Sequence, residues 1–311
     1  MSSGTLRTGP GSGDVDAQGI IDSRNLPDPD FDALWDAIII DASIKDRLLA
    51  QAILNFTLRT NPKVKRASIP LHGIILLVGF PGTGKTSLAQ GLASCTADVI
   101  SGCLYLEVEP HALTGRTLGT SQKAVTELLG ETVAERAATR PTIVLLDEVE
   151  TLAADRSKLS LEANPVDVHR ATDAVLAQLD HLAAKYPNLL FIATSNFPEA
   201  IDRAFFSRAD LVVTLDLPGP DARRKILVDT LDALAEAFPT VKRVATATDF
   251  EQAVQACDGL DGRRIRKLVA SACTFDKETA LDPSRLTTRD VIRAAEHAQR
   301  ESKSATKGGS V

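Results

Sequence analysis

The sequence predicts an α/β protein in which helices flank a parallel β-sheet and an all-helical domain follows. Three observations predict this fold class. Short apolar runs of strand type alternate with longer helical patterns between residues 74 and 215, as in sheets with both faces covered. A glycine-rich turn joins the first of these runs to a helical pattern. Beyond Pro218-Gly219-Pro220, helical patterns alone continue over about eighty residues, a size typical of a small domain.

Length and composition are those of an ordinary globular chain. The 311 residues are 44% apolar and 24% charged, enough for one large or two modest domains. The formal net charge is −6 (35 − 41), which argues against a general nucleic-acid binder. No apolar run approaches the ~18 residues that a membrane span needs. The four cysteines have no C-x-x-C spacing, so we expect reduced, packed thiols and a cytoplasmic protein.

The start of the chain is polar and then becomes helical. The first residues are rich in Gly, Ser and Asp, so we expect a disordered leader over residues 1–30. Apolar residues recur at helical spacing from Phe31 to Ile38, and a second helical pattern runs from Ser43 to Phe56. Trp35, the only tryptophan, is expected to anchor this segment to the core. Alternatively, the backbone of Ile40 and Asp41 borders an adenine ring, because it lies just ahead of the glycine-rich turn.

The sheet and the helical domain follow in order. Five apolar runs are predicted as strands: 74–78, 104–108, 142–148, 189–196 and 211–215. Helices are expected from Thr120 to about Arg136 and from about Val168 onward, with a polar loop over residues 155–167. Four further helices are expected at 222–237, 248–257, 261–275 and 288–299. We therefore predict a large α/β domain over residues 31–217, a helical domain over 218–300 and a flexible tail over 301–311.

The turn after the first strand fits the phosphate-loop pattern G-x-x-x-x-G-K-[ST]. Glycines let several backbone N–H groups point at a phosphate chain, and the following helix adds its positive dipole end. Lys85 is expected to reach the β- and γ-phosphates of ATP, and the Thr86 hydroxyl to hold Mg²⁺. A chance glycine turn between a strand and a helix is the alternative. The candidate ATP-binding residues are Pro81, Gly82, Thr83, Gly84, Lys85, Thr86 and Ser87.

Two acids, Asp147 and Glu148, close the strand predicted at 142–148. In a phosphate-loop sheet Asp147 is expected to hold Mg²⁺, and Glu148 to polarise the attacking water as general base. The alternative is a pair of solvated acids at a strand end. The second acid favours a hydrolase over a phosphate-loop kinase, because hydrolysis needs a carboxylate aimed at water.

Three further polar side chains are candidates for the same reaction. Asn196, at the end of the next strand, can orient water without adding charge, although an isolated Asn is usually a turn residue. Arg208 is a candidate finger for the γ-phosphate of a neighbouring subunit, with Arg203 a weaker candidate; the alternative is a solvated charge. Arg263 begins a basic helix and either folds over the nucleotide or is part of a plain basic face.

With these residues in place, the chain resembles the AAA+ ATPases over residues 31–300. The order of phosphate loop, Asp-Glu strand, Asn strand, arginine and Gly-Arg helix is specific to that class. Within it the chain is similar to the pachytene-checkpoint, or thyroid-hormone-receptor-interactor, remodellers. The residues that carry this resemblance are Phe31-Asp32-Ala33-Leu34-Trp35-Asp36, Gly82 to Leu88, Asp147 to Leu152, Asn164-Pro165-Val166-Asp167, Arg170 to Asp180, Thr194-Ser195-Asn196, Ile201-Asp202, Ala204-Phe205, Arg208-Ala209-Asp210 and Gly262-Arg263.

The resemblance implies a homohexameric ATPase that pulls a HORMA-domain protein through a central pore and opens its closed, partner-bound form. By position it makes Arg208 the trans-acting finger, Arg263 the lid sensor and Ile226 an adenine contact. Compact relatives occur in bacterial anti-phage (CBASS-type) systems, where the HORMA protein activates a nucleotidyltransferase. Two departures are expected to matter. The pore-loop position reads Arg116-Thr117-Leu118, without the family's aromatic residue, and a loose leader replaces the N-terminal adaptor-binding domain.

Other functions remain open on the sequence. A DNA-acting loader of the same class is less favoured because of the net charge of −6 and the lack of an aromatic-interleaved basic stripe. A nucleotide-gated binding module with little turnover is disfavoured by the presence of Glu148, Asn196 and Arg208.

Overall fold

The computed structural model describes residues 19–65, 67–109, 120–153 and 165–308. They divide into two compact units. The first consists of Met1–Ala37, Ala42–Gly79 and Lys85–Thr214, and the second of Ile38–Asp41, Phe80–Gly84 and Leu215–Val311. The second unit therefore combines the C-terminal helices with two short segments from much earlier in the sequence, Ile38–Asp41 and Phe80–Gly84. The predicted pore loop, Arg116-Thr117-Leu118, lies outside the described residues.

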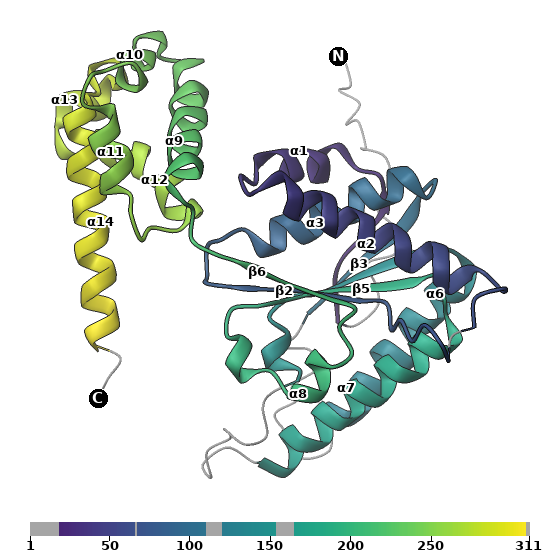
Figure 1. Cartoon of the computed structure of the whole chain (residues 1–311). Helices are drawn as coiled ribbons and strands as arrows, with labels where there is room; N and C mark the ends of the chain where they lie inside the picture. The colour runs from purple at the N-terminus through teal and green to yellow at the C-terminus, as the bar shows by residue number, and fades with distance from the viewer. Residues whose placement is uncertain (1–18, 66, 110–119, 154–164, 309–311) are drawn as a thin grey trace, which may run out of the picture. The chain divides into compact units, whose positions relative to one another are not determined.

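A six-stranded sheet in the order β1-β3-β4-β5-β2-β6 is the frame of the first unit (Figure 1). Strands β3, β4, β5 and β2 are parallel, and β1 is antiparallel to β3. The predicted α/β class with a mostly parallel sheet is therefore confirmed. The strands are β1 Ile20–Leu26, β2 Ile74–Gly79, β3 Cys103–Val108, β4 Thr142–Leu146, β5 Leu189–Ser195 and β6 Leu211–Leu215.

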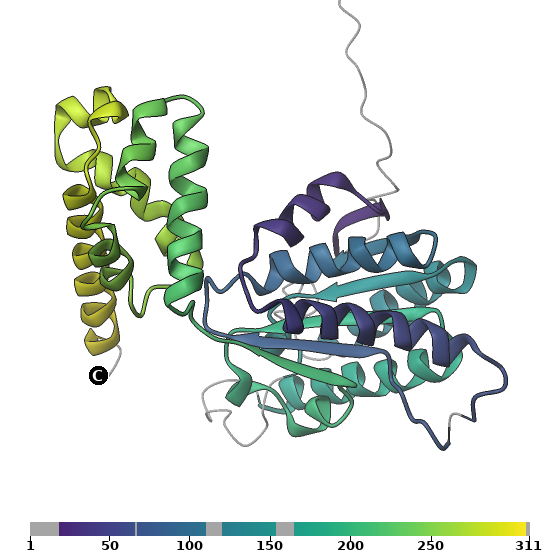
Figure 2. The same cartoon turned by 45° about the horizontal axis from the view of Figure 1, so that its top comes forward.

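The central strands are apolar throughout because both faces of the sheet are covered. Every residue of β4 and β5 is buried. Helices α2 (Ala42–Thr60) and α3 (Lys85–Val99) cover one face, and α7 (Pro165–Lys185) covers the other, as Figures 1 and 2 show. Alternate strand residues pack with α7 in one core, in which Val144, Phe191 and Leu179 are all at most 1% exposed. Helix α1 (Pro29–Ala37) packs against α3.

The second unit is helical, as expected for residues after 218. Its helices are α9 Pro220–Ala235, α10 Lys242–Ala245, α11 Phe250–Ala256, α12 Gly262–Ala272, α13 Lys277–Leu281 and α14 Thr288–Gly308. They share a core that includes Leu231, Ile265 and Val291, each fully buried. Within this core the sequence had not predicted the short helices α10 and α13.

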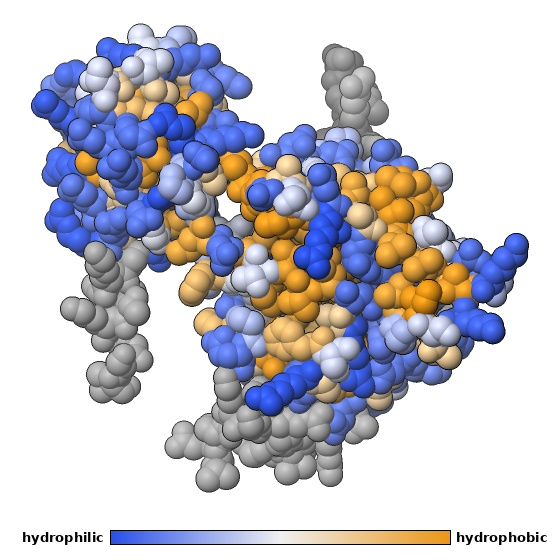
Figure 3. Space-filling model, viewed as in Figure 1, coloured by the Kyte–Doolittle hydropathy of each residue, from blue (hydrophilic) through white to orange (hydrophobic). Residues whose placement is uncertain are grey.

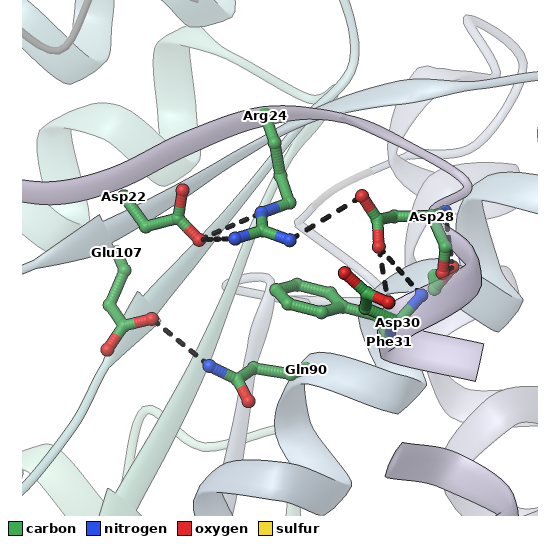
Figure 4. A network of polar contacts seen from close by, with 8 residues as sticks. Asp22, Arg24, Asp28, Asp30, Phe31, Gln90 and Glu107 are labelled. Carbon is green, nitrogen blue, oxygen red and sulfur yellow. Dashed lines mark hydrogen bonds and ion pairs between the residues drawn. The ribbon is translucent and has the colours of Figure 1, made fainter. Parts of the chain in front are cut away.

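The expectation of a disordered leader was wrong for residues 20–26, which form the edge strand β1. The charges that suggested disorder are paired, as Figure 4 shows. Arg24 Nε donates to Asp22 at 2.8 Å, and its guanidinium reaches Asp28 at 3.5 Å. The same guanidinium lies 4.5 Å from the centre of the Phe31 ring, a cation–π distance. Phe31 in turn packs edge-on against Tyr105 of β3 at 4.9 Å, so the strand is held by contacts made further along the chain.

Three other boundaries differ from the expectation. The flexible tail expected over 301–311 is wrong in part, because α14 continues to Gly308; its last residues include four good helix formers, Glu301, Lys303, Ala305 and Lys307. Helix α7 starts at Pro165, inside the expected polar loop, since proline suits the first helical position. The helix expected from Thr120 is interrupted by a π-helical segment at Leu128–Val133, between α5 (Thr120–Glu127) and α6 (Ala134–Thr139).

The surface of the sheet unit carries apolar patches on the face seen in Figure 3. Among its exposed large apolar side chains are Leu54, Ile69 and Val212, which are 43%, 44% and 39% exposed. Across the described ranges, no helix is both long and apolar enough to cross a membrane.

Candidate active site

The phosphate loop connects β2, which ends at Gly79, to α3, which begins at Lys85. Gly82 and Gly84 have φ angles of 83° and 91°, a region that favours glycine. A Cβ at Gly84 would lie 2.5 Å from Ile38 Cδ1, and one at Gly82 would overlap the Asp261 carboxylate. Both φ angles favour glycine, and a Cβ at either position would in addition have to displace the end of a neighbouring side chain.

The lysine of the loop, Lys85, is buried, and its ammonium group is held by a hydrogen bond. The residue is 5% exposed, and Lys85 Nζ donates to the Gly79 carbonyl at 2.8 Å. A buried ammonium needs such partners because an unpaired charge away from water is costly. Lys85 is thus kept at the carboxyl end of β2, where the loop begins.

Asp147 follows β4 and forms hydrogen bonds with hydroxyls from two other elements. Thr86 Oγ1, in the first turn of α3, donates to the two carboxylate oxygens at 3.0 and 3.2 Å. Thr194 Oγ1, on β5, donates to the same carboxylate and accepts from the Glu148 N–H at 3.2 Å. Thr194 was not predicted as a site residue. The available signal was a hydroxyl in an apolar strand, two positions before Asn196 and so on the same strand face.

Glu148 and Asn196 are brought together. Glu148 has a left-handed backbone, with φ 51° and ψ 52°, which is uncommon outside glycine and clusters at functional sites. Asn196 Nδ2 donates to Glu148 Oε1 at 3.0 Å, and the Asn196 backbone N–H donates to Glu150 Oε1 at 3.1 Å. Glu150 is a second residue that the sequence reasoning missed as part of the site.

Sheet order explains this convergence. Strands β4, β5 and β2 are neighbours and parallel, so their carboxyl ends meet at one edge. Gly79 is the last residue of β2, and Asp147 and Asn196 directly follow β4 and β5. Open parallel sheets bind ligands at this edge.

Arg208 is held by an ion pair within its own chain. Its Nε and one terminal nitrogen donate to the two carboxylate oxygens of Asp180 at 2.7 and 2.6 Å, and the other terminal nitrogen donates to the Ala204 carbonyl at 2.7 Å. The hydrogen bond from Arg208 lowers the pKa of the Asp180 carboxyl below its ordinary value. Two residues on, Asp210 accepts hydrogen bonds from three successive backbone N–H groups, those of His72, Gly73 and Ile74, at 2.9, 2.7 and 3.1 Å.

The remaining candidates belong to the helical unit. The Arg263 N–H, at the start of α12, donates to the Gly82 carbonyl at 3.3 Å, while the Arg263 side chain is exposed. Ile226 is buried on α9, and a Cβ at Gly262 would lie 3.7 Å from its Cδ1. Ile40 is half-buried and Asp41 exposed, in a segment whose Ile39 packs on the helical core. This unit thus groups the phosphate loop with Ile226 and the start of α12.

Possible metal ligands and the four cysteines complete the description of the chemically active side chains. In the part of the chain with described coordinates, no cluster of three or more His, Cys, Asp or Glu side chains could hold a metal ion. Any metal held by Thr86 and Asp147 would therefore need further ligands from a nucleotide and water. All four cysteines are free thiols; three are buried and Cys95 is half-buried, as the spacing predicted.

Comparisons with known proteins agree with this geometry. Residues 75–217 match the model of the ATPase family associated with various cellular activities (AAA). The chain is 57% identical over 283 residues to CD-NTase-associated protein 6 of Pseudomonas aeruginosa, covering 89% of this chain and 92% of that protein. It is 34% identical over 271 residues to the pachytene checkpoint protein 2 homolog of Xenopus tropicalis, covering 78% and 61% of the two chains. The chain therefore spans about three fifths of the pachytene checkpoint relative's length.

Solved structures extend the likeness to the fold. The structure of Caenorhabditis elegans PCH-2 superposes with a TM-score of 0.71 at 26% identity, covering 93% of this chain and 77% of that one. The structure of the Escherichia coli MS115-1 HORMA:CdnC:Trip13 complex contains a chain that matches with a TM-score of 0.69 at 16% identity, covering 90% and 95%, which is a likeness of fold alone. On the sequence relatives, the family model and the site together, this chain belongs to the AAA ATPase family, in the group of CD-NTase-associated protein 6 and the pachytene checkpoint protein 2 homologs.

Proposed function

We propose that this chain binds ATP with Mg²⁺ and hydrolyses it to ADP and phosphate. The observation that carries the proposal is the hydrogen-bonded set at the carboxyl edge of the sheet. There Thr86 bonds Asp147, and Asn196 bonds Glu148, beside the phosphate loop's Gly79 and Lys85. A phosphate cradle, an acid pair and a neutral amide are the groups that phosphoryl transfer to water requires, which supports the proposal.

The nucleotide is assigned to the phosphate loop. Lys85 and the backbone N–H groups of residues 81–87 would bind the phosphates, with the dipole of α3 favouring the negative charge. Ile226 and the Ile40-Asp41 backbone are the proposed adenine contacts. Arg263 is the proposed sensor of the γ-phosphate, supported by the hydrogen bond that ties the start of α12 to the loop at Gly82.

The side chains of Thr86 and Asp147 fit a magnesium ion. They offer a hydroxyl and a carboxylate within 3.2 Å of each other, and Mg²⁺ prefers oxygen ligands while keeping several waters and substrate phosphates. When bound, the ion would supply positive charge to the β- and γ-phosphate oxygens. Thr194 would keep Asp147 oriented through its own hydroxyl.

Glu148 is the proposed general base. Its carboxylate would accept a proton from the attacking water as the bond to the γ-phosphate breaks and ADP leaves. Asn196 would hold the carboxylate and the water in line without adding charge. The left-handed backbone of Glu148 supports this role, because residues in such sparsely populated conformations cluster at functional sites.

Arg208 is the proposed finger for a neighbouring subunit, which requires an assembled ring. The apolar patches of the sheet unit support self-association, since exposed patches often mark interfaces. The γ-phosphate of the neighbour would have to compete with Asp180, which engages Arg208 within the isolated chain. We infer a homohexamer from the family.

The proposed substrate is a HORMA-domain protein. The relative CD-NTase-associated protein 6 is named for an association with a nucleotidyltransferase, the CD-NTase. The solved bacterial complex contains HORMA, CdnC and Trip13 together. By extension, this chain would convert a closed HORMA protein bound to a nucleotidyltransferase, in a CBASS-type anti-phage system of the cytoplasm. The segment Arg116-Thr117-Leu118 is the proposed pore loop that grips the substrate.

Phosphate release at steady state tests the hydrolysis. Wild-type protein is expected to turn over ATP with Mg²⁺, and Glu148→Gln to lose at least about 10²-fold of the rate while still binding ATP. Arg208→Ala is expected to lose activity, whereas Arg203→Ala, a matched exposed arginine on the same segment, should keep it. Normal turnover by Glu148→Gln would refute the role of the base. Negligible turnover by the wild type would favour a nucleotide-gated binding module.

Mixing variants tests the shared site. Glu148→Gln lacks the base but keeps Arg208, and Arg208→Ala keeps the base. In mixed rings some interfaces combine an intact Glu148 with an intact Arg208, so activity should rise above that of either variant alone. A mixture no more active than its parts would argue against catalysis between subunits.

Capture with the hydrolysis-deficient variant tests the substrate. Glu148→Gln loaded with ATP should retain a purified HORMA-domain protein bound to its nucleotidyltransferase, and ADP should release it. Retention of double-stranded DNA instead, in the same buffer, would support a DNA-acting loader.

A further inference from the structure

Glu150 is a carboxylate beside the active site that the reaction described so far does not use. It lies in the short 3₁₀ turn Val149–Thr151, directly after the acid pair. Its Oε1 accepts the backbone N–H of Asn196 at 3.1 Å. Its Oε2 is buried and has no hydrogen-bond partner among the residues that the structure describes.

The unpaired oxygen is informative because it costs free energy. A buried acceptor without a partner loses its hydration and gains nothing, a penalty that native proteins mostly avoid. A neutral amide at this position would offer the same acceptor to Asn196. The fold thus tolerates an unfavourable group here, which is more common at functional sites than in plain cores.

The contacts place Asn196 between two carboxylates. Glu150 accepts a hydrogen bond from the Asn196 backbone N–H, and the side-chain amide of Asn196 donates to Glu148 Oε1 at 3.0 Å. Asn196 is the first residue after β5, where the strand ladder no longer fixes the chain. The bond to Glu150 therefore replaces the ladder and sets where the amide points.

We propose that Glu150 is a positioning residue for ATP hydrolysis, acting by holding the backbone of Asn196 so that its amide meets Glu148. This inference rests on the proposed ATPase function. In this role Glu150 acts only through Asn196, by way of the hydrogen bond to its backbone. Its effect passes through one hydrogen bond, so what matters is an acceptor at the correct reach and not the negative charge.

Two conservative variants separate reach from charge. Glu150→Gln keeps the acceptor oxygen at the same reach and removes the charge, whereas Glu150→Asp keeps the charge and shortens the side chain by one methylene. Glu150→Ala removes both, and Glu135→Ala, an exposed glutamate on α6, is the matched control. For each variant we would measure kcat and KM for ATP, the binding of mant-ADP, and thermal unfolding.

If positioning is correct, Glu150→Ala and Glu150→Asp lose about 10- to 100-fold in kcat, the range that small misplacements of catalytic groups produce. KM and mant-ADP affinity should stay within about threefold, because the phosphate loop is untouched. Glu150→Gln should recover to within about threefold of wild type, and Glu135→Ala should match it.

Two results would contradict the positioning role of Glu150, and a third would contradict the proposed ATPase function. An unchanged kcat in Glu150→Ala would overturn the proposal, with the ATPase function intact. Equal losses in Glu150→Gln and Glu150→Ala would also overturn it, because the charge and not the acceptor would then matter. If wild type and Glu135→Ala are both inactive, the proposed ATPase function is what fails. Should Glu150→Ala not fold, the opposite behaviour of the Gln and Asp variants still tests the idea.

Discussion

Replacing Asp210 with alanine is expected to destabilise the sheet unit by about 3 kcal/mol. Its carboxylate accepts hydrogen bonds from the backbone N–H groups of three successive residues, His72 to Ile74, at the start of β2. Hydrogen bonds to a charged group are worth about 1.5–3 kcal/mol each. The full sum overstates the loss, because Asp210 is half-buried and water can reach part of the site. We therefore take the equivalent of two bonds at the low end of that range, about 3 kcal/mol, as the net effect.

Urea unfolding followed by the fluorescence of Trp35 measures this loss. Trp35 is the only tryptophan and belongs to the sheet unit, so the signal reports that unit. The m-value should stay constant while the midpoint falls, and Tm should drop by about 6–12 °C for a unit of this size. Asp216→Ala, an exposed aspartate just beyond β6, is the control and should stay within about 0.5 kcal/mol of wild type. A loss below about 1 kcal/mol in Asp210→Ala would refute the reasoning.

Three further predictions address the loop, the ion pair and the thiols. Gly84→Ala should weaken mant-ADP binding at least about tenfold, because alanine at φ 91° is strained by roughly 1–2 kcal/mol; wild-type affinity would contradict this. Arg208 lowers the pKa of Asp180, so the pair stabilises the fold above the unfolded pKa of about 3.9 and that gain disappears as pH falls through the lower folded pKa. The stability difference between wild type and Asp180→Asn, at most about 1 kcal/mol for this partly exposed pair, should shrink from pH 6 to pH 3 in urea titrations. Burial raises the pKa of the Cys103 thiol to about 12, so mass spectrometry after iodoacetamide at pH 8 should find Cys95 modified in the native protein and Cys103 only after unfolding.

The carboxyl edge of the sheet, where we propose that ATP is hydrolysed, was predictable because its sequence signals are local. The phosphate loop, Asp147-Glu148 and Asn196 each lie directly after an apolar run, and parallel strands bring their ends together without further information. The hydroxyl that completes this site is harder to predict. Thr194 looked like one more residue of a buried strand, although its hydroxyl bonds both Asp147 and Glu148.

The features that sequence reasoning missed depend on contacts between distant residues. Strand β1 contains charged residues, so its sequence does not predict a strand. It is stabilised by the contact of Arg24 with Phe31 and by pairing with β3, about eighty residues along the chain. Asp210 lies directly before β6 and carried no local signal of its role, yet it accepts hydrogen bonds from N–H groups up to 138 residues away. Local propensity carries no information on such pairings, since a carboxylate in a turn has the same pattern whether or not it binds the backbone of another strand.

The position of Asp210 also bears on how the two halves of the proposed reaction are connected. Strand β2 is held at its first residue by Asp210, two positions after Arg208, and ends at Gly79, where the phosphate loop begins. The strand has six residues, a length of about 17 Å, and lies buried between two neighbours in the sheet. A buried strand of this kind transmits displacement rather than absorbing it, because close packing leaves no room for slip. The segment that carries the proposed finger and the loop that would hold the phosphates are therefore attached to opposite ends of one stiff element. Asp210→Ala, which removes this anchor, should for that reason reduce the rate of ATP turnover even at temperatures where the fold is intact.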